Sequence, residues 1–97
     1  MTLDWLSIIG DRNTLKVLLE LDDGTPKTLY SISRGIGSYP RTTRSRLRLL
    51  VKRGIVSEER LGGALTYRLN RSALPEEVRS FLTWLKAHAL TGQVTSR

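Results

Sequence analysis

Apolar residues recur at helical spacing over most of the chain. Near the N-terminus, Leu3, Leu6 and Ile9 are spaced for one face of a short helix that Gly10 ends. A second helix is expected to begin at a capping side chain, Asp11 or Asn13, and to turn three leucines inward, namely Leu15, Leu18 and Leu19. Residues 22–24 close this helix, and residues 25–27 are expected to form a connector.

Two further helices are predicted on either side of a glycine-containing turn at residues 35–38. The first is short, with Thr28 as its N-cap and an inner side formed by Leu29, Ile32 and Ser33. The second spans residues 40–53, because proline at position 40 suits a first helical turn and Gly54 supplies a stop signal. Its predicted inner side consists of Thr43, Leu47, Leu50 and Val51.

After Gly54 the apolar period changes from helical to alternating, which predicts a two-stranded hairpin. One strand starts at Ile55-Val56 and runs through Arg60, residues 61–64 turn, and residues 65–69 return. A last helix is expected to be capped by Ser72 and to carry a wide apolar stripe made of Leu74, Val78, Phe81, Leu82, Leu85 and Ala89, with Trp84 and His88 on its flank. Residues 1–90 are therefore predicted to form one domain, and residues 91–97 a flexible tail.

Charge is concentrated in the middle of the chain. The net charge is +7, yet residues 24–57 hold eight bases and no acid. Six of these cations lie in or directly beside the predicted helix at residues 40–53 (Arg41, Arg44, Arg46, Arg48, Lys52 and Arg53). An amphipathic helix with this charge can pack on one face and contact a polyanion with the other, so we expect an anionic partner such as nucleic acid.

Several other classes of protein are disfavoured. The chain has no cysteine and a single histidine, which removes the usual ligands of zinc and other soft-metal sites. No nucleophile–base pair, acid–base carboxylate cluster or phosphate-binding glycine loop is visible, so we expect neither an enzyme nor a cofactor. No apolar run is long enough to cross a bilayer and no signal peptide is recognisable, and a cytoplasmic protein without a membrane partner is expected.

The order of these elements and their residues resembles a winged helix-turn-helix domain of the ArsR/MarR-like superfamily. Residues 28–37 resemble the first motif helix with its turn, residues 40–47 the recognition helix, residues 50–56 its exit into the wing, and residues 65–69 the wing's return strand. Residues 11–19 are also similar to the opening helix of ArsR-like regulators. The resemblance implies a mainly α fold with a small β-hairpin, in which N- and C-terminal helices flank the core.

The resemblance also implies roles in binding double-stranded DNA. The recognition helix would enter the major groove, and its predicted base contacts are Arg41, Thr42, Arg44, Ser45 and Arg46. The predicted backbone contacts are Thr28, Tyr39, Arg48 and Lys52. In the wing, Gly62 and Gly63 form the tip and Arg60 is the best candidate for a contact in the adjacent groove, whereas Arg68 can equally pair with Glu58 or Glu59 across the hairpin.

Regulators of this family commonly dimerise through their terminal helices. The apolar side chains that exceed the needs of a monomer core are candidates for the dimer interface: Leu3, Trp5, Leu6, Trp84, His88 and Leu90. The alternative is that Trp5 and Trp84 complete the core of a monomer.

The function that these features favour is a dimeric transcriptional regulator, for instance a repressor. A plasmid or viral protein for partition or replication could use the same fold and the same surface. A winged-helix module for protein–protein interaction is a further alternative, although six cations on one helix argue against it.

Overall fold

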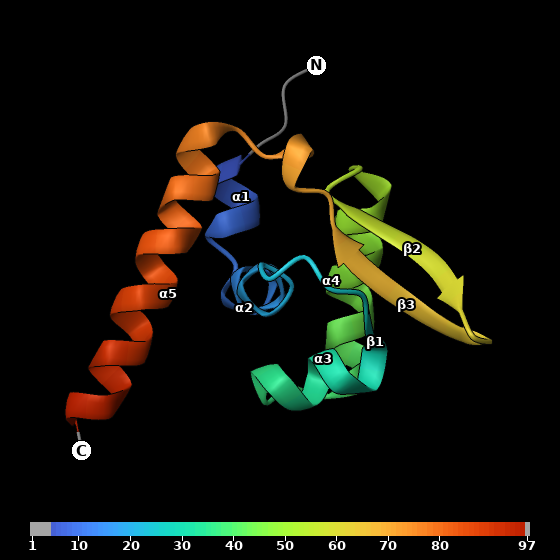
Figure 1. Cartoon of the computed structure of the whole chain (residues 1–97), viewed down its shortest axis with the longest axis horizontal. Helices are drawn as coiled ribbons and strands as arrows, with labels where there is room; N and C mark the ends of the chain where they lie inside the picture. Colours follow the sequence, from blue (N-terminus) through green and yellow to red (C-terminus); the bar gives the residue numbers. More distant parts are fainter. Residues whose placement is uncertain (1–4, 97) are drawn as a thin grey trace.

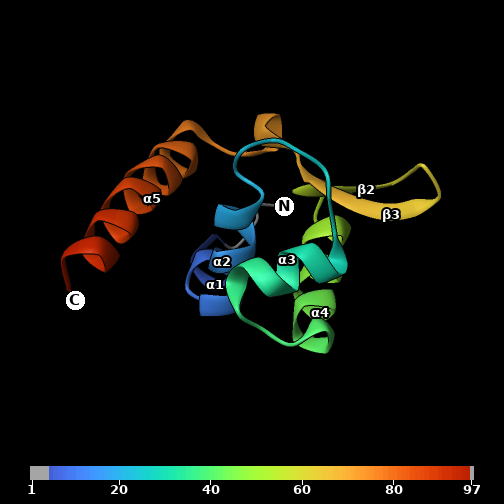
Figure 2. The ribbon, with the colours of Figure 1, turned by 60° about the horizontal axis from the view of Figure 1, so that its bottom comes forward.

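The structure is a computed structural model that describes the backbone of residues 5–96 and the side chains of residues 5–88. Its elements are, in order, α1 (Trp5–Ile9), α2 (Arg12–Glu20), β1 (Lys27–Thr28), α3 (Leu29–Ile36), α4 (Pro40–Lys52), β2 (Val56–Leu61), β3 (Ala64–Leu69), a 3-10 turn (Arg71–Ala73) and α5 (Glu76–Ser96). The small sheet lies on one side of α2, α3 and α4, and α5 lies on the other (Figures 1 and 2). This arrangement confirms the expected winged helix-turn-helix fold.

The core is formed where the inner faces of α2, α3 and α4 meet the root of the hairpin. Its fully buried side chains include Leu18 of α2, Ile32 of α3, and Leu47 and Leu50 of α4. In α2 the inner face is centred on Val17 and Leu18, while Leu15 and Leu19 are only partly buried. In α1 the buried residue is Ile8, which is not one of the three residues predicted to share a face, and Leu6 is 78% exposed.

Local signals in the sequence set the ends of the three central helices. The side chain of Asp11 caps α2 and that of Thr28 caps α3, each accepting a hydrogen bond from a backbone N–H three residues on. At the end of α4, Gly54 adopts a φ of 78°, which a residue without a Cβ reaches at low cost. The N–H groups of Gly54 and Ile55 then donate to the carbonyls of Val51 and Leu50, so the helix ends in a Schellman motif. The predicted caps and stop are thus confirmed, but α3 runs through Gly35 and Ile36, which were expected to lie in the turn.

The sheet has three strands in the order β1-β3-β2, one more than the predicted hairpin. The extra strand, β1, pairs antiparallel with β3 and places Lys27 opposite Tyr67. The hairpin turns at Gly62 and Gly63, whose φ values of 58° and 85° give a two-residue type I′ turn. This turn fixes the register of the wing and places Glu58 opposite Tyr67 and Arg60 opposite Leu65.

One expectation for the C-terminal region needs correction. Ser72 does not cap the last helix, because residues 71–73 form a 3-10 turn and α5 begins at Glu76, with the carbonyl of Pro75 accepting the first helical hydrogen bonds. The turn is fixed to α2 by Arg71, whose guanidinium lies 2.5 Å from Oδ1 of Asp22 and donates to its backbone carbonyl. Helix α5 continues to Ser96, and the flexible tail expected for residues 91–97 stays a prediction.

Candidate nucleic-acid interface

The outer face of α4 carries most of the side chains that were predicted to contact bases. Arg41, Arg44 and Ser45 are exposed and Thr42 is half-buried, whereas Thr43 on the inner face is fully buried. Arg48 and Lys52 continue the exposed row toward the end of the helix. The polar and apolar faces predicted for α4 are confirmed, and the polar face is open to a ligand.

Arg46 is placed differently from the other cations of α4. Its Nε lies 2.9 Å from Oδ2 of Asp11, which is an ion-pair distance, although the N–H is not aligned for a hydrogen bond. The side chain is half-buried against the start of α2. The ion pair ties α4 to α2, and the role of Arg46 in reading bases stays a prediction.

Asp11 is consequently both a helix cap and an ion-pair partner. One of its carboxylate oxygens, Oδ2, accepts hydrogen bonds from the backbone N–H and the hydroxyl of Thr14, at 2.9 and 2.7 Å. These two bonds, together with the charge of Arg46, lower the pKa of Asp11 below its usual 3.8, against a smaller opposing effect of burial.

We expect Asp11→Ala to lower the free energy of unfolding by about 1 kcal/mol at neutral pH, the usual value of a lost N-cap. Because the folded-state pKa is lowered, the charge-dependent share of this contribution is fully present above the unfolded-state pKa and is lost as the pH falls through the folded-state value. Chemical denaturation of the two proteins between pH 7 and pH 2 should therefore show the difference in their stabilities narrowing in acid. Asp11→Asn is the control, since it keeps a capping oxygen and should lose only the smaller share that depends on charge.

The predicted backbone contacts lie around the exposed face of α4. Tyr39, which precedes the helix, is 82% exposed, and Lys52 is exposed at its other end. Thr28 caps α3, which places it at the N-terminus of the neighbouring helix. Tyr39 and Lys52 thus lie at opposite ends of α4.

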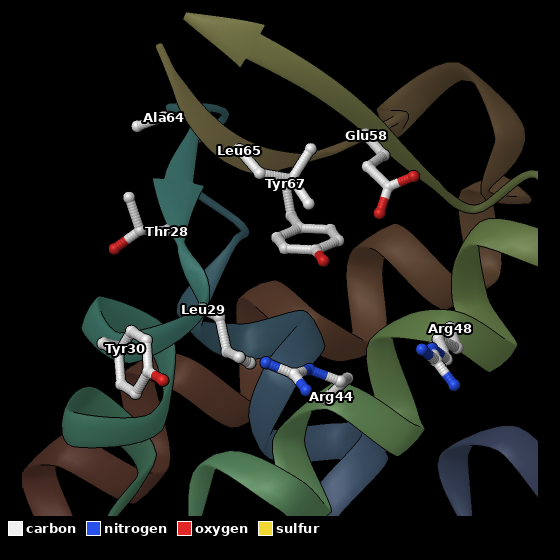
Figure 3. Close-up of a pocket in the computed structure, with 9 residues that line it drawn as sticks. All are labelled: Thr28, Leu29, Tyr30, Arg44, Arg48, Glu58, Ala64, Leu65 and Tyr67. Carbon is white, nitrogen blue, oxygen red and sulfur yellow. The ribbon is translucent and has the colours of Figure 1, made fainter.

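A hollow of about 480 Å³ lies between α4, the start of α3 and the wing (Figure 3). It brings together two of the predicted DNA contacts of α4, Arg44 and Arg48, with Thr28 at the start of α3. Its other lining residues are Leu29, Tyr30, Glu58, Ala64, Leu65 and Tyr67. The hollow therefore joins the recognition helix and the wing into one continuous surface.

Tyr67 and Glu58 form the wing side of this hollow, and neither was among the predicted site residues. Tyr67 is only 5% exposed, and its ring points from β3 toward α4 (Figure 3). Burial raises the pKa of its hydroxyl above 10.0 and the nearby Glu58 carboxylate raises it further, while Arg44 and Arg48 act in the opposite direction. The signal that could have found the pair is the Gly62-Gly63 turn, because a two-residue connection fixes which residues of the two strands face each other.

The wing presents one cation on the same face as the hollow. Arg60 lies opposite Leu65, and residues that are directly opposite in a sheet point to the same side. Its guanidinium donates to the carbonyl of Gly63 at 3.3 Å, so it reaches back over the tip. On the other face of the wing, Nη2 of Arg68 lies 3.5 Å from Oε1 of Glu59. The partner of Arg68 is therefore Glu59 and not Glu58.

The candidate interface residues on the terminal helices differ in their exposure. Trp84 is 54% exposed and stacks between Phe81 and His88, with ring centroids 6.5 and 4.3 Å apart. The ring of His88 donates from Nδ1 to the carbonyl of Trp84 at 2.8 Å. Leu6 is also exposed, whereas Trp5 is half-buried against the core. Leu3 lies outside the described residues, as does the side chain of Leu90.

The interpretation in which Trp84 completes the monomer core is therefore wrong, and for Trp5 it is partly right. Phe81, which belongs to the apolar stripe predicted for this helix, also lies at the surface. Within residues 5–96, no helix has the length and apolar character needed to span a membrane. Among the side chains that the structure describes, no group of three or more histidine, cysteine or acidic residues could hold a metal ion.

Solved structures of known proteins share this architecture at low sequence identity. The transcriptional repressor BigR from Xylella fastidiosa superposes with a TM-score of 0.67 at 21% identity, over 84% of this chain and 79% of BigR. The antimony-specific transcriptional repressor AntR gives a TM-score of 0.66 at 17% identity, over 95% and 78% of the two chains. The homodimeric winged helix-turn-helix DNA-binding domain Mb0332 from Mycobacterium bovis, described as a possible ArsR-family transcriptional regulator, gives 0.62 at 20%, over 94% and 79%.

No protein-family model and no curated protein sequence matches this chain. At identities near 20%, the similarity to the solved structures concerns the fold. It shows a winged helix-turn-helix domain, with α3 and α4 as the helix-turn-helix pair and β2–β3 as the wing.

Proposed function

We propose that this protein binds double-stranded DNA sequence-specifically as a homodimer and regulates transcription. The observation that carries the proposal is the exposed cationic face of α4, which continues across the hollow to the wing. Residues 24–57, which include α4, hold eight bases and no acid. Four of these bases, Arg41, Arg44, Arg48 and Lys52, are exposed on α4. Such a surface attracts the phosphates of a duplex, and a single α-helix fits the major groove.

The roles of individual residues follow from their places on this surface. Arg41, Thr42, Arg44 and Ser45 lie on the N-terminal half of α4 and are proposed to contact base edges, since recognition helices of this type read bases near their N-terminal end. Thr28, Tyr39, Arg48 and Lys52 are proposed to hold phosphates. The wing, with Arg60 near its tip, is proposed to reach the adjacent groove or backbone.

The proposed dimer uses the exposed side chains of the terminal helices, above all Leu6 and Trp84. We favour a second copy of this chain as the partner that covers these side chains. One recognition helix contacts only a few base pairs, and a two-fold arrangement doubles the length of the DNA site. The similarity to a domain described as homodimeric supports this choice.

Regulation of transcription is favoured over partition or replication, because the structural neighbours described above are regulators or repressors by name. A protein-interaction module is disfavoured by the charge of α4, since the centres of protein interfaces are depleted in charged residues.

The test of the proposed function is a binding selection from random duplex DNA, followed by titration at several salt concentrations. We expect a palindromic consensus, and a logarithm of affinity that falls with the logarithm of salt concentration with a slope of about −5 or steeper for a dimer, given roughly −0.9 for each phosphate contacted. An affinity that hardly changes between low and physiological salt would refute DNA binding through this surface.

A further inference from the structure

Glu58 differs from the other acids of the described region, because it has no cation within ion-pair distance and does not lie in the first turn of a helix. The other acids either lie within ion-pair distance of a cation (Asp11, Glu20, Asp22, Asp23 and Glu59) or occupy the first turn of α5, where the helix dipole favours negative charge (Glu76 and Glu77). For Glu58, no lysine or arginine of the described residues comes within ion-pair distance. Its closest described polar neighbour is instead the hydroxyl of Tyr67.

Glu58 lies in the hollow beneath the wing. The carboxylate of Glu58 points from β2 into the space that Arg44 and Arg48 face from α4 (Figure 3). It lies opposite Tyr67 in the strand register, and the proximity of the two groups is evident in the effect of Glu58 on the Tyr67 hydroxyl. Glu58 is the only acid among the residues that line this hollow.

A duplex bound to α4 and the wing together would pass its sugar-phosphate backbone across this hollow. Each phosphate there would be attracted by two guanidinium groups and repelled by one carboxylate. We propose that Glu58 limits the affinity of the protein for DNA by repelling the backbone between the recognition helix and the wing. This inference rests on the proposed function, and it places a charge that opposes binding on the proposed DNA-binding surface.

The repulsion acts on phosphates, which carry no sequence information, so it weakens specific and non-specific complexes by the same factor. Non-specific binding comes almost entirely from the phosphate term, and the opposing charge keeps more of the protein free of random DNA. Base contacts made by the N-terminal half of α4 would still decide which site is preferred.

The test compares Glu58→Gln with Glu59→Gln by titration of fluorescently labelled duplexes, one with the preferred site and one with a random sequence of equal length. The two variants change the net charge equally and at adjacent positions, but Glu59 lies on the opposite face of the wing, paired with Arg68. We expect Glu58→Gln to bind both duplexes about tenfold more tightly with a steeper salt dependence, as expected when a like charge leaves an interface. Glu59→Gln should stay within about twofold of the unmodified protein, the size expected for an exposed charge.

Equal tightening by the two variants would overturn the inference, because it would reflect net charge alone. An unchanged affinity in Glu58→Gln would also overturn the inference. So would a loss of affinity for the preferred duplex alone, which would indicate that Glu58 accepts a hydrogen bond from a cytosine. If the unmodified protein binds neither duplex, the proposed function itself fails, and the inference fails with it. Thermal unfolding verifies that Glu58→Gln is folded, and Glu58→Ala serves as the second variant because it removes the same charge.

Discussion

Replacing Arg44 by alanine is expected to weaken binding to the preferred duplex by about 1 to 3 kcal/mol and to relax the choice of base at the position it reads. Arg44 is exposed on α4 and forms no ion pair within the described region, so its removal leaves the core intact. The guanidinium can donate two hydrogen bonds to one guanine, and alanine leaves those acceptors unsatisfied. Binding isotherms on the preferred site and on its single-base variants measure both effects.

The matched control is Lys52→Ala, which removes one positive charge at the far end of the same helix. Because Lys52 is assigned to a phosphate, we expect this change to weaken all duplexes by a similar factor. The magnitude of the salt slope should fall by about one in each subunit, since one phosphate there is no longer neutralised. If both variants bound preferred and random DNA with equally reduced affinity, α4 would be a non-specific contact.

Trp84→Glu is expected to convert the proposed dimer to a folded monomer. Truncating a central aromatic of an interface costs about 2 kcal/mol or more, and a two-fold interface contains each such residue twice, so the dimer should weaken by about a thousandfold. Since Trp84 is more than half exposed, the monomer core is little affected. Sedimentation at tens of micromolar measures the oligomeric state, and the variant should also lose its preference for two half-sites about 34 Å apart.

Leu61→Glu is the control for this experiment. Leu61 is an exposed apolar residue at the tip of the wing, remote from α5 (Figure 1). The change adds the same charge to the surface, and the protein should remain a dimer. An unmodified protein that sediments as a monomer, both free and on DNA, would exclude the proposed interface.

Much of the fold was predictable because its helix ends are set by local chemistry. Thr28 and Asp11 cap their helices through their own side chains, and Gly54 ends α4 with a backbone conformation that other residues avoid. The amphipathic pattern of α4 is equally local, since three of the four residues predicted for its inner face are buried. Signals of this kind need no knowledge of the rest of the chain.

What could not be predicted depends on partners distant in sequence. Strand β1 has two residues, too few to show alternation, and exists because β3 offers it an edge. Arg46 looks like its neighbours on α4, and only the packing of α2 brings Asp11 to it. The inward choice of Ile8 over Leu6 likewise depends on how α1 meets α2, which a five-residue helix cannot specify by its own period.

The hydrogen-bonded end of α4 has a mechanical consequence. Ile55 donates to Leu50 and then leads directly into β2, and both side chains are fully buried. These contacts join the end of α4 to the root of the wing, and we expect the two elements to move together. In the proposed complex, a mismatch between the spacing of these two contacts and the spacing of the grooves must be taken up by bending or twisting of the duplex. Base pairs that no side chain touches would then influence affinity through their deformability, with flexible pyrimidine–purine steps favoured where the duplex has to bend.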